Sequence, residues 1–146
     1  MSKKFRTGEC GSTLVEFSIA AMVFLTAMFG VIEFGRALWV HNALTDAVRR
    51  GARYAVTHSS GNADQVKNVV VYGDPAGGTK PLVPNLSTGN VTVNYSNFAL
   101  NKGTATVGID KYKFQFVIPI VGTTITMPKY STTLTGESVG WIPKDM

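Results

Sequence analysis

The sequence predicts an α+β protein in which one long N-terminal helix packs on a C-terminal antiparallel β-sheet. Three observations predict this class. Residues 12–32 form an apolar run that is long enough to cross a bilayer as a helix. A helical periodicity of three and four residues continues from there to residue 57. Behind the helix, several short segments alternate between apolar and polar residues, as half-buried strands do.

The composition fits one modest domain with an appendage. The chain has 146 residues, and the 45% of them that are hydrophobic suffice for a core and exclude wholesale disorder. The formal net charge is +5, but the basic residues are dispersed and form no stripe interleaved with aromatic residues, so we do not expect nucleic acid as a partner. Cys10 is the only cysteine, which excludes an intrachain disulfide. It precedes the apolar run, whereas a bacterial lipid-attachment cysteine follows one, and we interpret it as an incidental thiol.

The apolar run 12–32 predicts a transmembrane helix. Its only ionisable side chain is Glu16, and a spanning helix needs about 20 residues. A secretory signal peptide is the alternative, but its apolar core is normally shorter, about 7 to 15 residues. The segment Gly35-Arg36-Ala37 is also a poor cleavage site, because it lies beyond the charged Glu33.

The basic residues around this run predict its orientation. Lys3, Lys4 and Arg6 lie within a few residues of the run, whereas only Arg36 is close on the other side. Because lysine and arginine accumulate on the cytoplasmic side of a membrane helix, the N-terminus is expected inside the cell.

Glu16 is the unusual residue of the run. On insertion scales a carboxylate at mid-membrane costs about 2.5 to 3.5 kcal/mol, and less near an interface. The positive end of the helix macrodipole recovers only roughly 0.3 to 1 kcal/mol of this cost. A carboxylate in the first turns of the helix is therefore tolerable, but its place five residues after Gly11 is left without an explanation.

The combination of Gly11, a four-residue gap and Glu16 ahead of an apolar helix resembles type IV pilin-like proteins, whose leaders end in Gly-x-x-x-x-Glu. More narrowly, residues 11–56 resemble the TadE-like minor pilins, or pseudopilins, of tight-adherence (Tad, Flp) pilus systems. The positions that carry this resemblance are Val15, Glu16, Phe17, Glu33, Phe34, Gly35, Arg36, Ala37, Asn42, Ala43, Leu44 and the segment Arg49–Ala55.

The resemblance implies a pilin-like fold and a processing site. A prepilin peptidase would cut after Gly11, which would make Ser12 the mature N-terminus, and Glu16 would then pair with the N-terminal amine of a neighbouring subunit. The physics agrees, because a carboxylate and an ammonium that leave water each need a partner. Major Tad pilins are very short and have Glu-Tyr at this place, whereas Glu16 is followed here by Phe17 and a further domain, which indicates a minor component.

The predicted helix runs from about Thr13 to Thr57, roughly 65 to 70 Å at 1.5 Å per residue, and residues 33–58 form its amphipathic extension. Glu33 and Arg36 are i, i+3 neighbours and predict a solvent-side ion pair worth roughly 0.2 to 0.5 kcal/mol. Small residues would permit close approach of a second helix or of the protein's own sheet, and we expect the sheet for the C-terminal members of this set. The set comprises Gly30, Gly35, Ala43, Ala47, Gly51 and Ala52.

Residues 59–146 predict an α+β domain. Three valines at helical spacing behind Asn62 or Asp64 as N-cap predict a short helix, with a strand as the alternative. The segment 73–89 is rich in proline and glycine and is expected to be a loop. Four or five antiparallel strands with one buried face are then predicted within 91–95, 104–109, 111–120, 123–127 and 130–139, with Tyr112, Phe114 and Phe116 on one face of the third.

The sequence offers no catalytic or metal-binding set. His41 and His58 are the only histidines, and Cys10 lies in the leader, so the usual clusters of metal ligands are missing. Residues 73–80 imitate a phosphate-binding loop, but the order Gly-Thr-Lys at 78–80 reverses the required one and Pro75 removes a backbone donor. We therefore expect neither an enzyme nor a cofactor.

Together with the resemblance, these features predict a minor pilin or pseudopilin that takes part in initiation, capping or regulation of a Tad-type pilus for surface adherence. The leader 1–11 would lie in the cytoplasm, the helix 12–32 in the bacterial inner membrane and the domain 59–146 outside. The expected partners are the prepilin peptidase, other pilin-like subunits, the pilus assembly platform and membrane lipid. Two alternatives remain: an unprocessed single-pass protein whose outer domain binds a ligand or partner, and a secreted soluble domain that begins near Leu38.

Overall fold

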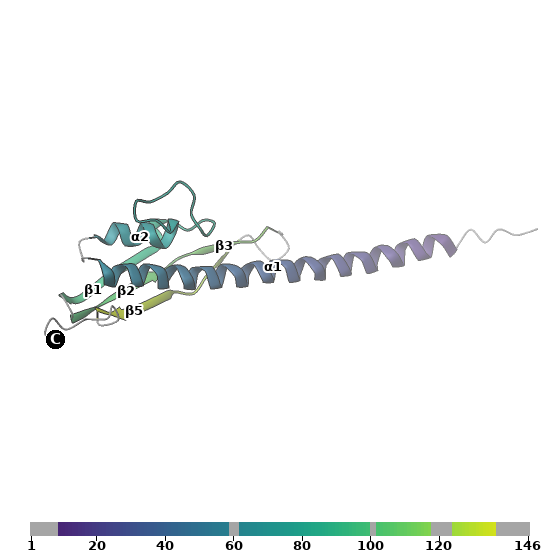
Figure 1. Cartoon of the computed structure of the whole chain (residues 1–146). Coiled ribbons are helices and arrows are strands. Elements are labelled where there is room, and N and C mark those ends of the chain that lie inside the picture. The colour runs from purple at the N-terminus through teal and green to yellow at the C-terminus, as the bar shows by residue number, and fades with distance from the viewer. Residues whose placement is uncertain (1–8, 59–61, 100–101, 118–123, 137–146) are drawn as a thin grey trace, which may run out of the picture. The chain divides into compact units, whose positions relative to one another are not determined.

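The computed structural model describes residues 9–58, 62–99, 102–117 and 124–136 of the chain (Figure 1). Within these residues it contains a long α-helix, a short α-helix, a 3-10 helix and five strands. Their bounds are α1 (Glu9–Thr57), α2 (Ala63–Tyr72), η2 (Thr88–Asn90), β1 (Val91–Ala99), β2 (Lys102–Ile109), β3 (Lys113–Gln115), β4 (Thr124–Thr126) and β5 (Tyr130–Thr135). The chain divides into two compact units, Met1–Arg36 and Ala37–Met146, and α1 contributes to both.

Helix α1 confirms the predicted long helix and begins earlier than expected, at Glu9 rather than near Thr13. No proline occurs between residues 9 and 57, so nothing in the chain interrupts the helical hydrogen bonds over this length. The helix ends at Thr57, as the sequence predicted. The predicted stop signal at residues 59–61 and residues 1–8 of the predicted leader lie outside the described residues.

The core of the second unit forms between the last third of α1 and the strands beside it (Figure 1). Helix α1 contributes residues that recur at three- and four-residue steps and are almost completely buried, namely Val40, Leu44, Ala47, Val48, Ala52 and Ala55. From the sheet, Ala105, Val107 and Ile109 of β2 fill the opposite side of this core. The α+β class predicted from the sequence is therefore confirmed, with α1 packed on an antiparallel sheet.

Helix α2 confirms the short helix predicted for the valine-rich segment after residue 62. It buries Val66, Val70 and Val71 in the same core, and Val69 is buried as well. Asn62 occupies the predicted N-cap position, but its side chain makes no capping hydrogen bond, so the capping role expected for it is wrong. At the other end Gly73 adopts a left-handed φ of 81° and its N–H donates to the Val69 carbonyl oxygen over 3.0 Å, which ends the helix.

The predicted strands form two sheets rather than one. Strands β1, β2 and β5 pair in that order in an antiparallel sheet, and β3 pairs with β4 in a separate two-stranded sheet. The break between the sheets follows Lys111, whose φ of 57° turns the chain after β2. The third predicted strand is accordingly shorter, 113–115 instead of 111–120, and residues 118–120 lie outside the described residues. Tyr112 and Phe114 are buried and Phe116 is half-buried, which confirms their common apolar face.

Candidate processing and assembly site

The predicted cleavage position lies in the first turns of α1. Gly11 and Ser12 are both exposed and helical. A Cβ atom added at Gly11 would meet no atom within 4 Å, so packing within the chain does not require glycine there. Any requirement for a small residue at this position must therefore come from another molecule.

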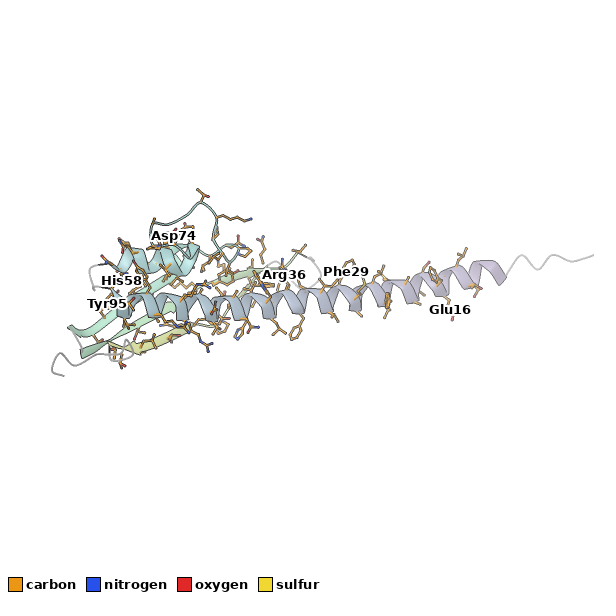
Figure 2. All side chains as sticks on the ribbon, in the orientation of Figure 1. Glu16, Phe29, Arg36, His58, Asp74 and Tyr95 are labelled. Atoms are coloured by element: carbon orange, nitrogen blue, oxygen red, sulfur yellow. The ribbon has the colours of Figure 1, made fainter. Side chains whose placement is uncertain are left out.

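Glu16 lies one turn beyond Ser12 on the same face of α1, because residues four apart in a helix are neighbours. Its side chain is exposed and projects from the first part of the helix (Figure 2). Within the part of the chain that the structure describes, it takes part in no hydrogen bond or ion pair. The carboxylate is thus available to a group from another chain.

The surface around Glu16 is apolar and uncovered. The side chains of Val15 and Phe17 are 61% and 70% exposed, and the large hydrophobic side chains of the following turns are exposed as well. The helix Gly11–Thr57 contains an 18-residue window with a mean hydropathy of 2.1, none of which is buried within the protein. Among the described residues it is the one helix that is long and apolar enough to span a membrane.

Two hydroxyl groups within the apolar run are satisfied by the helix itself. Ser18 Oγ donates to the Leu14 carbonyl oxygen and Thr26 Oγ1 to the Met22 carbonyl oxygen, both over 2.8 Å. A hydroxyl group that donates a hydrogen bond to the carbonyl oxygen four residues earlier leaves no unpaired donor in the hydrocarbon region of a membrane. Among the ionisable and hydroxyl side chains of this segment, Glu16 therefore differs from Ser18 and Thr26 in having no such bond.

Glu33 and Arg36 form the predicted ion pair, but not on the solvent side. Arg36 Nη2 lies 2.6 Å from Glu33 Oε1, and Glu33 is only 8% exposed. The expectation of a solvent-exposed pair is wrong for the carboxylate. Its burial is tolerable because the guanidinium compensates the charge at hydrogen-bond distance. Of the other motif positions, Phe34 is 67% exposed and Gly35 faces open space.

The C-terminal small residues of α1 make a close approach, but at Gly51 the nearest neighbour is helix α2, with the expected sheet next to it. A Cβ atom at Gly51 would lie 2.3 Å from Val70 Cγ2 of α2 and 3.3 Å from Val107 Cγ1 of β2. Ala47 and Ala52 are completely buried. Gly30 and Gly35, in contrast, would meet nothing within 4 Å, so their small size is not used inside the chain.

A contact between His41 and Tyr130 was not predicted from the sequence. His41 Nδ1 lies 2.9 Å from Tyr130 Oη, and the two ring centroids are 5.3 Å apart, which joins α1 to β5. Burial raises the pKa of the Tyr130 phenol above its ordinary value of 10.0. The two residues are 89 positions apart, so no local pattern in the sequence could have connected them.

These features define a class of protein with one N-terminal helix able to span a membrane and an α+β unit behind it. Residues 11–53 match the family described as TadE-like protein, which confirms the resemblance seen in the sequence. Over these residues the chain is similar to that family. The match begins at Gly11 and includes Glu16, Glu33 and Gly51. Comparisons with curated proteins and with solved structures gave no match.

Proposed function

We propose that this protein is a minor pilin or pseudopilin that takes part in the assembly of a Tad-type pilus for surface adherence, by initiating, capping or regulating it. The observation that carries the proposal is the family match that starts at Gly11 and includes Glu16, an exposed carboxylate with no partner among the described residues, in an otherwise apolar helix. A charge that is costly in a membrane favours a partner from a second chain.

Cleavage after Gly11 would create this partner. The cut removes the leader with Lys3, Lys4 and Arg6 and produces an ammonium group on Ser12, one turn from Glu16. In a row of parallel helices shifted along their axes, the ammonium of one subunit meets the Glu16 carboxylate of its neighbour. Each charge then leaves headgroup water with its countercharge beside it, which offsets the desolvation of both.

The rest of the membrane segment supplies the packing for such a contact. Gly30 and Gly35 face open space within the chain and allow a neighbouring helix to approach closely. The proposed partners are therefore the prepilin peptidase, other pilin-like subunits, the assembly platform and lipid of the inner membrane. In this arrangement the N-terminus faces the cytoplasm and the unit from Ala37 onward lies outside.

The variant Glu16→Gln tests the proposed pairing. It keeps the size of the side chain and removes its charge, so we expect normal cleavage but strongly reduced incorporation into, or support of, the pilus in a strain that carries all other pilus genes. Ser18→Ala is the matched control, because the Ser18 hydroxyl is already satisfied by the Leu14 carbonyl oxygen. Pili at the normal level with Glu16→Gln would refute the pairing.

The variant Gly11→Val tests the processing site separately. Because a Cβ atom at Gly11 meets nothing within 4 Å, a loss of cleavage reports recognition by the peptidase rather than misfolding. Gly35→Val is the control, since Gly35 lies in the same helix and also faces open space. We expect an uncut chain for Gly11→Val and a cut chain for Gly35→Val. Normal cleavage of Gly11→Val would place the processing site elsewhere.

A further inference from the structure

A groove of about 330 Å³, lined by residues with polar or charged side chains, lies in the second unit. Its volume is that of a small-molecule site, at the lower end of the range of about 300 to 1,000 Å³. The residues that line it come from the loop before η2, from η2, from the β2–β3 turn and from strands β3 and β4, and they are Asn85, Asn90, Lys111, Lys113, Gln115 and Thr124.

Asn90 forms a fixed part of the groove wall. Its side-chain amide nitrogen donates to the carbonyl oxygens of Asp110 and Lys111 over 3.2 and 3.4 Å. Its Oδ1 accepts a hydrogen bond of 2.8 Å from Ser87 Oγ. The hydrogen-bonding groups of Asn90 are thus used to hold the β2–β3 turn against η2, which gives the groove a defined shape.

A tight turn positions Asn85 in the lining of the groove. The Leu86 N–H donates to the Val83 carbonyl oxygen over 3.2 Å, and Asn85 has a φ of 63°, as expected for an asparagine that follows proline in a type II turn. Tyr112 Oη donates to the Pro84 carbonyl oxygen over 2.7 Å and anchors this turn to the segment before β3.

The pairing of β3 with β4 brings the other polar residues to one face. Lys113 and Gln115 are exposed on either side of the buried Phe114, and Gln115 pairs with Thr124. Because alternate residues of a strand and directly paired residues share a face, Lys113, Gln115 and Thr124 all point away from the core.

Lys111 has an unusual backbone conformation in the turn between β2 and β3. Its φ of 57° lies in the left-handed region, which residues with a Cβ atom avoid and which asparagine or glycine usually occupies. The side chain is exposed and lines the groove. This turn, which the hydrogen bond from Asn90 to the Lys111 carbonyl oxygen helps to hold, brings Lys111 into the lining of the groove.

The groove offers several free polar groups of suitable chemistry. Within the described ranges, the side chains of Asn85, Lys111, Lys113 and Thr124 make no hydrogen bond and no ion pair. No carboxylate and no aromatic ring belongs to the lining described. Two uncompensated ammonium groups attract an acid, and an amide beside a hydroxyl can bond the hydroxyl groups of a sugar.

We propose that this groove binds an acidic saccharide, a sugar that carries a carboxylate or a phosphate. The ammonium groups of Lys111 and Lys113 hold the acidic group, and the Asn85 amide and the Thr124 hydroxyl bond the sugar hydroxyls. A neutral sugar is a poorer fit, because it carries no negative charge to pair with the two lysine ammonium groups. The lining described also has no aromatic ring on which a sugar face could stack. This site does not depend on the proposed role in pilus assembly.

The test uses the full-length protein in phosphatidylcholine nanodiscs and trigalacturonate as the probe, with binding measured by calorimetry at low salt. The double variant Lys111→Asn/Lys113→Gln removes both charges, and asparagine adopts the left-handed conformation readily, so the fold is retained. We expect its affinity for trigalacturonate to be at least about tenfold lower. The control Lys67→Gln/Lys80→Gln makes the same change of charge outside the groove and is expected to bind normally.

Three further outcomes would overturn the proposal. The first is the absence of saturable binding of trigalacturonate to the unaltered protein. The second is an equal loss of affinity in the control variant, which would show a general attraction by net charge. The third is equally tight binding of inorganic phosphate or of neutral maltotriose, either of which would exclude recognition of an acidic sugar. Melting temperatures of both variants close to that of the unaltered protein show that lost binding is not lost folding.

Discussion

The contact at Gly51 makes the effect of one added methyl group predictable. In Gly51→Ala the new Cβ atom would lie 2.3 Å from Val70 Cγ2 and 3.3 Å from Val107 Cγ1. Valine is short and stiff at χ1, so Val70 cannot swing clear and one of the helices must shift. Overpacking of this kind costs about 1 to 3 kcal/mol. The higher helix propensity of alanine returns roughly 1 kcal/mol.

The expected net result is a free energy of unfolding that is lower by about 0 to 2 kcal/mol, since the overpacking exceeds or just offsets the gain in propensity. At roughly 4 °C per kcal/mol for a unit of this size, the melting temperature falls by up to roughly 8 °C. The assay is thermal unfolding of the full-length protein in detergent micelles, followed by near-ultraviolet circular dichroism.

The same substitution in the Val70→Ala variant tests the steric origin of this effect. Val70→Ala removes the Cγ2 atom and leaves the Val70 Cβ position at 3.7 Å, an ordinary van der Waals distance. Adding Gly51→Ala to Val70→Ala should therefore be neutral or stabilising, although Val70→Ala alone is destabilising because it empties a buried site. An identical effect of Gly51→Ala in both backgrounds would refute the argument, because it would show that the two side chains do not compete for the same space.

Further predictions concern the tyrosines of the second unit. Tyr130→Phe removes the hydrogen bond to His41 and should lower the free energy of unfolding by about 0.5 to 1.5 kcal/mol in denaturant titrations at neutral pH. Because burial raises the pKa of Tyr130, the folded protein keeps this proton to higher pH than the unfolded chain does, so stability should decline as pH rises above about 10. The decline should be smaller in Tyr130→Phe, and an equal decline in both proteins would contradict this origin. Tyr112→Phe removes the bond to the Pro84 carbonyl oxygen, and backbone amides around Asn85 should then exchange hydrogen faster while those of α1 do not change.

The sequence predicted the parts of the fold that depend on local periodicity. The buried positions of α1 from Val40 to Ala55 recur at helical spacing, and the alternation in β2 places Val107 and Ile109 in the core, so each pattern is visible within a few residues. The short helix predicted after residue 62 is also confirmed, at residues 63–72, because the valines follow the helical period.

The sequence could not predict features that depend on distant contacts or on a single dihedral angle. The chain leaves the first sheet at Lys111, which has a left-handed backbone conformation. Lysine rarely adopts this conformation, so the residue type does not predict it. The contact of His41 with Tyr130 and the assembly of the groove both join segments far apart in the chain. Gly11 and Glu16 were recognised by their spacing, but the partner proposed for Glu16 belongs to another molecule.

The most direct test of the central claim is the intact mass and the N-terminal residue of the protein, isolated from its native membrane with and without the prepilin peptidase. The proposed function predicts that residues 1–11 are lost only when the peptidase is present, which leaves Ser12 first. An uncut chain in both samples would contradict it and would favour an unprocessed, membrane-anchored protein whose outer unit binds a ligand.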